Sequence, residues 1–210
     1  SLRRHYDGEA ILLVSSRSGS ELADYLRRRG IRGVAFDCAY WMTVDLQFAR
    51  YIRYAELLRE ATQPHDRVML SDVGDVLFQA DPFAGLPDGD LLLFLEDERT
   101  RIGDSPANAL WIEQVYGAQT LARYRNERIS CSGTTIGSHL AMSGYLERML
   151  WEGRPEVAQR MGRYRGYDQG IHNVLLHSGA LAGATCVANG EFVWTLHNVP
   201  DHEIAVASDG

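Results

Sequence analysis

Residues 67–75 read Arg67-Val68-Met69-Leu70-Ser71-Asp72-Val73-Gly74-Asp75, an apolar run that leads directly into two carboxylates. A short apolar run followed by turn residues is typical of a buried strand. A second run, Leu91–Leu95, ends in the same way at Glu96. In open α/β sheets, ligands bind beyond the carboxyl ends of the strands. The two runs therefore predict a sheet that gathers its polar groups at one edge.

The flanking residues predict strands that alternate with helices. Residues 10–14 are continuously apolar and indicate a fully buried strand. Apolar residues at helical spacing indicate helices elsewhere. Helices are expected at 21–29, 45–61, 107–116, 138–151 and 169–177, and a further strand at 33–37. The last three helices flank a short segment at 129–136. This order favours an α/β fold, a single Rossmann-like domain with a mostly parallel central sheet and helices on both faces.

Composition limits the classes of partner. The 210 residues fit one domain spanning 1–210, and the formal net charge of -7 argues against nucleic acid as a partner. All 21 basic residues are Arg, so lysine chemistry is excluded. No run approaches the roughly 20 apolar residues of a membrane span. Three widely spaced cysteines without a close pair favour a reducing compartment, and a cytoplasmic location is expected.

The acidic turn after residues 67–71 suggests a metal site. Carboxylate oxygens suit Mn²⁺ or Mg²⁺, which take one or two protein carboxylates and complete their coordination with water and phosphate. Asp72 and Asp75 leave the predicted strand together, separated by Val73 and Gly74. A solvated acidic turn is the alternative explanation of the same residues.

Three segments together resemble one family. Residues 70–83, from Leu70 to Phe83, resemble the Asp-x-Asp region of GT-A glycosyltransferases, particularly relatives of glycogenin and the lipopolysaccharide galactosyltransferases. Residues 130–137 resemble the Asn-Ser-Gly segment that approaches the donor sugar, and residues 167–173 the Asp-Gln-x-x-x-Asn segment beside the reacting carbon. The resemblance spans about residues 10 to 200. It implies a GT-A domain that moves a sugar, most simply from a UDP-sugar, to a hydroxyl of a glycan or other acceptor.

The resemblance also implies roles for individual residues. Asp72 and Asp75 would hold Mn²⁺ (or Mg²⁺) on the diphosphate, and Asp168 and Gln169 would act at the reacting face. The positions expected to contact the donor, with its base near the end of the first strand, are Ser15, Ser16, Arg17, Arg50, Arg53, Ser132 and Gly133. A polar surface loop explains the three residues 15–17 equally well.

Two departures from the family pattern leave metal ligands open. The spacing Asp72-Val73-Gly74-Asp75 is longer than Asp-x-Asp, so either aspartate is a candidate for the direct ligand. The family also supplies a histidine near its C-terminus. His197 is the nearest candidate, and a ligand in a segment missing after residue 210 is the alternative.

Other interpretations remain open at this stage. Glu96 and Asp97 end a strand beside the predicted site, where a carboxylate can bind an acceptor hydroxyl or act as a base, or simply belong to a solvated loop. Asp72 also opens a segment similar to the nucleophile loop of haloacid-dehalogenase phosphatases, although Gly74 would replace the general acid. A non-catalytic relative that binds a nucleotide or glycan is a third possibility. The sequence does not identify the donor sugar, the acceptor, the stereochemistry or the oligomeric state.

Overall fold

The computed structural model describes residues 1–36, 46–154, 156–157, 161, 166–197 and 199–200, which form a mixed α/β structure. Strands β1 (Ile11–Ser15) and β2 (Arg32–Phe36) form a parallel pair, and α1 (Ser20–Arg28) connects them in the chain. A four-stranded sheet has the order β3-β5-β4-β6. Its strands are β3 (Val68–Ser71), β5 (Ser130–Gly137), β4 (Leu91–Leu95) and β6 (Ala184–Val187).

The four-stranded sheet is mixed, which corrects the expectation of a mostly parallel sheet. β5 is antiparallel to both β3 and β4, and only the β4–β6 pair is parallel. Because β3 and β4 both oppose β5, they run in the same direction. Ser71 pairs with Thr134, and Leu95 pairs with Ser130. The segments that follow β3 and β4 therefore leave the sheet at one edge, as the sequence predicted.

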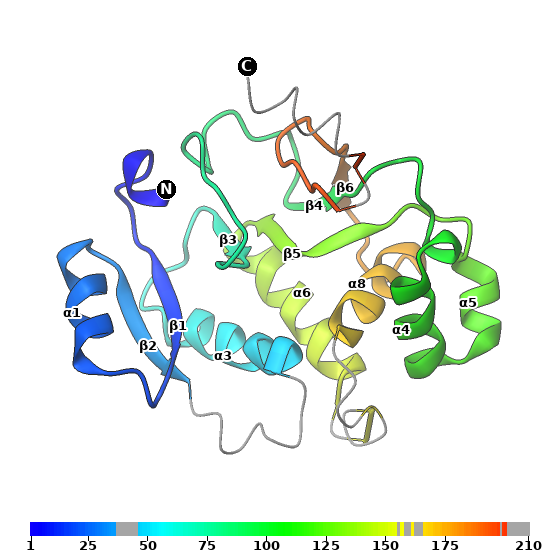
Figure 1. Cartoon of the computed structure of the whole chain (residues 1–210), viewed down its shortest axis with the longest axis horizontal. Coiled ribbons are helices and arrows are strands. Elements are labelled where there is room, and N and C mark those ends of the chain that lie inside the picture. Colours follow the sequence, from blue (N-terminus) through cyan, green and yellow to red (C-terminus); the bar gives the residue numbers. More distant parts are fainter. Residues whose placement is uncertain (37–45, 155, 158–160, 162–165, 198, 201–210) are drawn as a thin grey trace.

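Helices pack on one face of this sheet and loops cover the other (Figure 1). The helices are α3 (Leu46–Glu60), α6 (His139–Glu152) and α8 (Tyr167–His177). Leu91 and Leu93 join the core cluster beneath these helices, whereas Leu92 and Phe94 join a second cluster that includes loop side chains such as Phe83. The alternation follows from the two-residue period of a strand. Helices on both faces, as predicted for this sheet, are thus replaced on one face by apolar loop residues.

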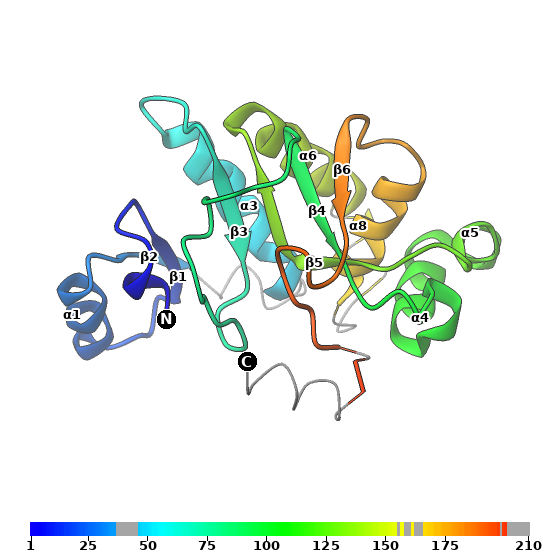
Figure 2. The same ribbon diagram turned by 90° about the horizontal axis from the view of Figure 1, so that it is seen from above.

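The helix ends follow familiar capping rules. The Ser138 side chain accepts a hydrogen bond from the backbone N–H of Ala141 and so caps α6. Ser105 caps α4 (Pro106–Tyr116), which begins with proline at the first helical position. The remaining elements are α5 (Ala118–Tyr124) and the 3₁₀ turns η1 (Leu2–Arg4) and η2 (Ile102–Asp104). In the view from above, α4 and α5 lie at the opposite end of the molecule from β1 and β2 (Figure 2).

The β1–β2 pair is a separate and more exposed sheet. Ile11 is 37% exposed, and no residue of β1 is fully buried, so the prediction of a fully buried first strand is wrong. The pair lacks a ladder to β3 among the described residues, so neighbouring strands do not enclose it. Packing between Tyr6 and Phe83, with ring centroids 5.3 Å apart, connects this end to the loop after β3. Within the described part of the chain, no helix has the length and apolar character needed to cross a membrane.

Candidate functional site

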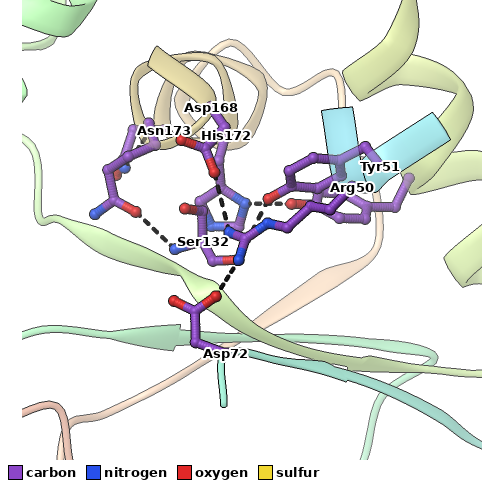
Figure 3. Close-up of polar contacts among 9 residues, drawn as sticks. Arg50, Tyr51, Asp72, Ser132, Asp168, His172 and Asn173 are labelled. Carbon is purple, nitrogen blue, oxygen red and sulfur yellow. Dashed lines mark hydrogen bonds and ion pairs between the residues drawn. The ribbon is translucent and has the colours of Figure 1, made fainter. Parts of the chain in front are cut away.

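One arginine joins two of the predicted acidic residues. Arg50 of α3 donates through Nη1 to Oδ1 of Asp72, at the end of β3. Its Nη2 donates to Oδ2 of Asp168, in the first turn of α8, over 3.0 Å. The guanidinium lies between the two carboxylates (Figure 3). Residues that are 118 positions apart in the chain are therefore held together by a forked pair of charge-assisted hydrogen bonds.

The charges in this arrangement are unequally buried. The Asp168 side chain is 4% exposed, Arg50 18% and Asp72 40%. Burial disfavours the charge of Arg50. Its neighbours, chiefly Tyr51, Asp168 and Asp72, outweigh this effect and raise the pKa of Arg50 above the ordinary value. Arg50 is thus permanently charged and compensates the buried Asp168. Asp72 is the member of the group that faces solvent.

Gln169 connects the sheet to a second buried carboxylate. Its Oε1 accepts the backbone N–H of Ser132 at 2.7 Å, and its Nε2 donates to Oε1 of Glu96 at 2.9 Å. These two partners fix the orientation of the amide, because a backbone N–H requires an oxygen and a carboxylate requires a donor. Gln169 therefore holds β5 against the end of β4 and leaves only one amide hydrogen for a ligand.

Glu96 and its neighbour Asp97 have different environments. Glu96 is 4% exposed, and burial raises its pKa, opposed by the charge of His197 and by the hydrogen bond from Gln169. Asp97 instead accepts from the side chain of Arg99, its partner in an ion pair of 2.5 Å. Glu96 is therefore not part of a solvated loop. Asp97 pairs with Arg99 in the turn that follows β4.

The rest of α8 is fixed to β5 by neutral groups. Asn173 accepts the backbone N–H of Ser130 at 2.8 Å and donates to its carbonyl at 3.0 Å. His172 bridges Ser130 Oγ at 2.9 Å and the Tyr145 hydroxyl at 2.8 Å. Burial lowers the pKa of His172 to about 3, so the ring is neutral at ordinary pH. These contacts position Asp168 and Gln169 and need no substrate to explain them.

The absence of a side chain at Gly133 leaves room for the carboxylate of Asp72. The backbone N–H of Asp72 donates to the carbonyl of Gly133 at 2.9 Å. A Cβ atom on Gly133 would lie 2.6 Å from Oδ2 of Asp72, closer than any ordinary contact. Glycine at this position therefore lets the carboxylate lie against the strand. Beside it, burial raises the pKa of the Cys131 thiol to about 11, which makes this cysteine a poor nucleophile.

The acidic turn after β3 carries the two aspartates predicted to bind a metal. Among the residues described, no three His, Cys, Asp or Glu side chains are grouped so as to hold a metal. Asp72 Oδ1 is taken by Arg50, while Asp75 lies exposed in the turn beyond it. The charge of His197 lowers the pKa of Glu96, and a role of His197 as a metal ligand stays a prediction. Two carboxylates are the number that Mg²⁺ or Mn²⁺ uses when phosphates supply further oxygens.

The structure does not bring every expected donor-binding residue to this cluster. Arg53 pairs with Glu56 at 2.8 Å and Glu60 at 3.0 Å on its own helix. Ser15, Ser16 and Arg17 are exposed at the end of β1, where the Arg17 backbone N–H donates to Ser15 Oγ at 3.2 Å. Ser132, in contrast, lies within the cluster, 8% exposed. Contact of residues 15–17 and Arg53 with a donor stays a prediction.

Sequence reasoning did not place the supporting residues of the site. Glu96 was one of two candidate carboxylates, and its bond to Gln169 depends on β4 lying next to β5. Tyr51, whose hydroxyl donates to the Ser132 carbonyl at 3.4 Å, gave no signal beyond an apolar helix position. One signal was available in α8. The spacing of Asp168, Gln169, His172 and Asn173 puts four polar side chains on one face of the helix.

Comparisons with known proteins return no relative for this chain: no family model, no curated protein and no solved structure matches it.

Proposed function

We propose that this protein is a metal-dependent glycosyltransferase that moves a sugar from a nucleotide-diphosphate donor, most simply a UDP-sugar, to an acceptor hydroxyl. The observation that carries the proposal is the bridge that Arg50 makes between Asp72 and Asp168. It supports the proposal because the two aspartates belong to different segments that resemble the GT-A family. The Ser132 segment, bonded to Gln169, is the third.

The solvent-facing part of the group suits a diphosphate. Asp72 and Asp75 would hold Mn²⁺ (or Mg²⁺), which would neutralise the charge that builds on the diphosphate as the sugar bond breaks. Arg50 holds Asp72 in place through its hydrogen bond to Oδ1. The other oxygen of Asp72, Oδ2, lies against Gly133 of β5. Arg50 also adds positive charge where the phosphates would bind.

The buried part suits the sugar and the reacting face. Asp168 pairs with Arg50 and presents a fixed carboxylate at the start of α8. Ser132 and Gly133 would contact the sugar, because β5 approaches Asp72 through backbone atoms alone at Gly133. Gln169 acts here by holding Ser132 and Glu96 in register. The preorganised cluster would orient the donor without large movement of these groups.

Calorimetric titration with UDP, with and without Mn²⁺, tests the proposal. The wild-type protein should bind UDP on the order of tenfold more tightly with Mn²⁺, and Asp72→Asn and Asp75→Asn should each remove that gain. Glu98→Gln, at an exposed position, is the control and should retain it. Equal UDP affinity with and without Mn²⁺ in the wild type would contradict the metal-dependent scheme.

Assays of turnover separate the transferase from its rivals. Slow Mn²⁺-dependent release of free sugar from a UDP-sugar is expected of a transferase. Hydrolysis of a phosphate monoester that depends on Asp72 would favour the phosphatase. Saturable UDP binding without any sugar release from a panel of UDP-sugars would favour a non-catalytic binder.

A further inference from the structure

A short loop after β6 reaches back to the candidate site. Phe192 stacks on Phe94 of β4, with ring centroids 6.0 Å apart. Phe192 and Val193 also pack against the cluster of Leu92, Phe94 and Ile136 on the loop-covered face of the sheet. The charge of His197 lowers the pKa of Glu96, which follows β4. Residues 189–197, here called the β6 loop, therefore cover β4 from that face, next to the strand end that carries Glu96.

The β6 loop is internally rigid. The Asn189 side chain donates to the Thr195 carbonyl at 3.0 Å and accepts its N–H at 2.7 Å. The backbone N–H of Gly190 donates to the Val193 carbonyl at 2.9 Å. Side-chain and backbone bonds of this kind fix a loop that would otherwise lose much entropy on binding a ligand.

Trp194 is held at the surface of this loop with one face supported. Its Nε1 donates to the Gly190 carbonyl at 3.1 Å. A Cβ atom on Gly190 would lie 2.8 Å from that nitrogen and 2.9 Å from Cε2, so the indole rests on the bare glycine backbone. The side of the ring away from Gly190 contributes to an exposed fraction of 53%. The exposed face of the indole offers an apolar, π-rich surface on which a ligand ring can stack.

A polar group without a partner lies directly after β4, the strand on which Phe192 packs. Oε2 of Glu96 is buried and has no hydrogen-bond partner among the residues that the structure describes, while Oε1 is satisfied by Gln169. An unpaired buried carboxylate oxygen costs free energy and points to a missing donor. A hydroxyl is a suitable donor, and a shift of the β6 loop, which covers β4, would admit it.

We infer that the β6 loop and Glu96 form the acceptor subsite, and that the acceptor is a carbohydrate whose ring stacks on Trp194 and whose hydroxyl donates to Glu96. The inference rests on the proposed function, because it assigns the acceptor of that reaction. A sugar ring combines an apolar C–H face with hydroxyl donors at its edge. That combination matches an exposed indole on the loop that covers β4 and an unpaired carboxylate oxygen at the end of that strand.

Saturation-transfer NMR on the protein without nucleotide tests the subsite. The probes are the methyl glycosides of glucose, galactose, mannose and N-acetylglucosamine. At least one should bind saturably, with the strongest transfer at ring C–H protons. Trp194→Ala should weaken this binding at least fivefold, Trp194→Phe less, and Glu96→Gln at least threefold. These affinities are compared with those for UDP and Mn²⁺, which the proposed function assigns to Asp72 and Asp75.

Two matched controls guard against general damage. Trp151, 69% exposed and stacked with Arg154 at the end of α6, is replaced by Ala, and exposed Glu98 is replaced by Gln. Both variants should retain glycoside binding, and circular dichroism verifies that every variant is folded. Absence of saturable binding by all four glycosides, or equal binding by wild type and Trp194→Ala, would overturn the inference. Glycoside binding that depends on Trp194 in a protein that ignores UDP would instead uphold the subsite and refute the transferase.

Discussion

The β1–α1–β2 unit and the four-stranded sheet were both predicted from apolar runs, but they have different environments. In β4 every residue is buried, whereas in β1 no residue is fully buried. The predicted residues that gather in the candidate site come from α3, β5, α8 and the segments directly after β3 and β4, and none comes from the N-terminal unit. Polar residues are therefore held in place where neighbouring strands and helices bury the strand that carries them. Four substitutions test how sharply the two regions differ.

The largest effect is expected from Arg50→Ala. Asp168 is only 4% exposed, and removing one partner of a buried ion pair lowers the free energy of unfolding by about 3 kcal/mol. Arg53→Ala is the control on the same helix. Because Arg53 pairs with the surface residues Glu56 and Glu60 of its own helix, its loss should stay within about 0.5 kcal/mol. Urea unfolding at neutral pH measures the stability of both variants. Equal losses of stability would show that the bridge contributes no more than a surface ion pair.

His172 should make the stability of the protein depend on pH. Its folded-state pKa is about 3, below the ordinary value of 6.5, so the unfolded chain takes up the proton first. The stability that neutral His172 provides is complete above pH 6.5 and is lost as the pH falls toward 3. Between pH 8 and pH 5 the loss is about 2 kcal/mol.

Urea unfolding at several pH values checks this slope. His172→Gln should be less stable at pH 8, because its contacts with Ser130 and Tyr145 change, but it should lose less stability on acidification. His5→Gln in the exposed N-terminal unit is the control, and its slope should match the wild type. A slope that survives unchanged in His172→Gln would assign the pH dependence to other groups.

Gly133→Ala should damage the site more than the fold. The added Cβ would lie 2.6 Å from Asp72 Oδ2, so the carboxylate has to move away from its position. We expect a loss of about 1 kcal/mol in stability and on the order of tenfold in UDP affinity with Mn²⁺. Gly74→Ala adds the same methyl where nothing lies within 4 Å, and should leave both nearly unchanged. Calorimetry of the two variants makes the comparison, and equal affinities would mean that the position of Asp72 does not matter.

These contrasts also explain what the sequence could and could not predict. Leu91–Leu95 was predicted to the residue, because a run of five apolar residues between turns has few alternatives. The direction of β5 was not predicted, since the residues of a strand do not indicate whether its neighbours are antiparallel. β6 and α5 were missed because each is short, at 4 and 7 residues, and carries little periodicity.

The candidate site divides in the same way. Asp72, Asp168 and Arg50 could be named from motif order, because each motif is local in the chain. The bond between Gln169 and Glu96 joins residues 73 positions apart and follows only once β4 and β5 are known to be neighbours. The exposed environment of residues 15–17 was equally hidden, because it depends on which strands flank β1.

Arg17→Ala should have the smallest effect and decides whether the N-terminal unit takes part in binding. The residue is exposed, so any contact with a nucleotide base or phosphate would be made in solvent and would be worth only about 0.5 kcal/mol, or roughly a twofold loss of UDP affinity. Arg27→Ala, on the exposed face of α1 where Arg27 pairs with Asp24, removes the same charge from the same unit. Calorimetry should separate the two variants by that small factor. Equal affinities would remove residues 15–17 from the site, whereas a loss as large as that of Asp72→Asn would mean that the exposed unit closes onto the donor.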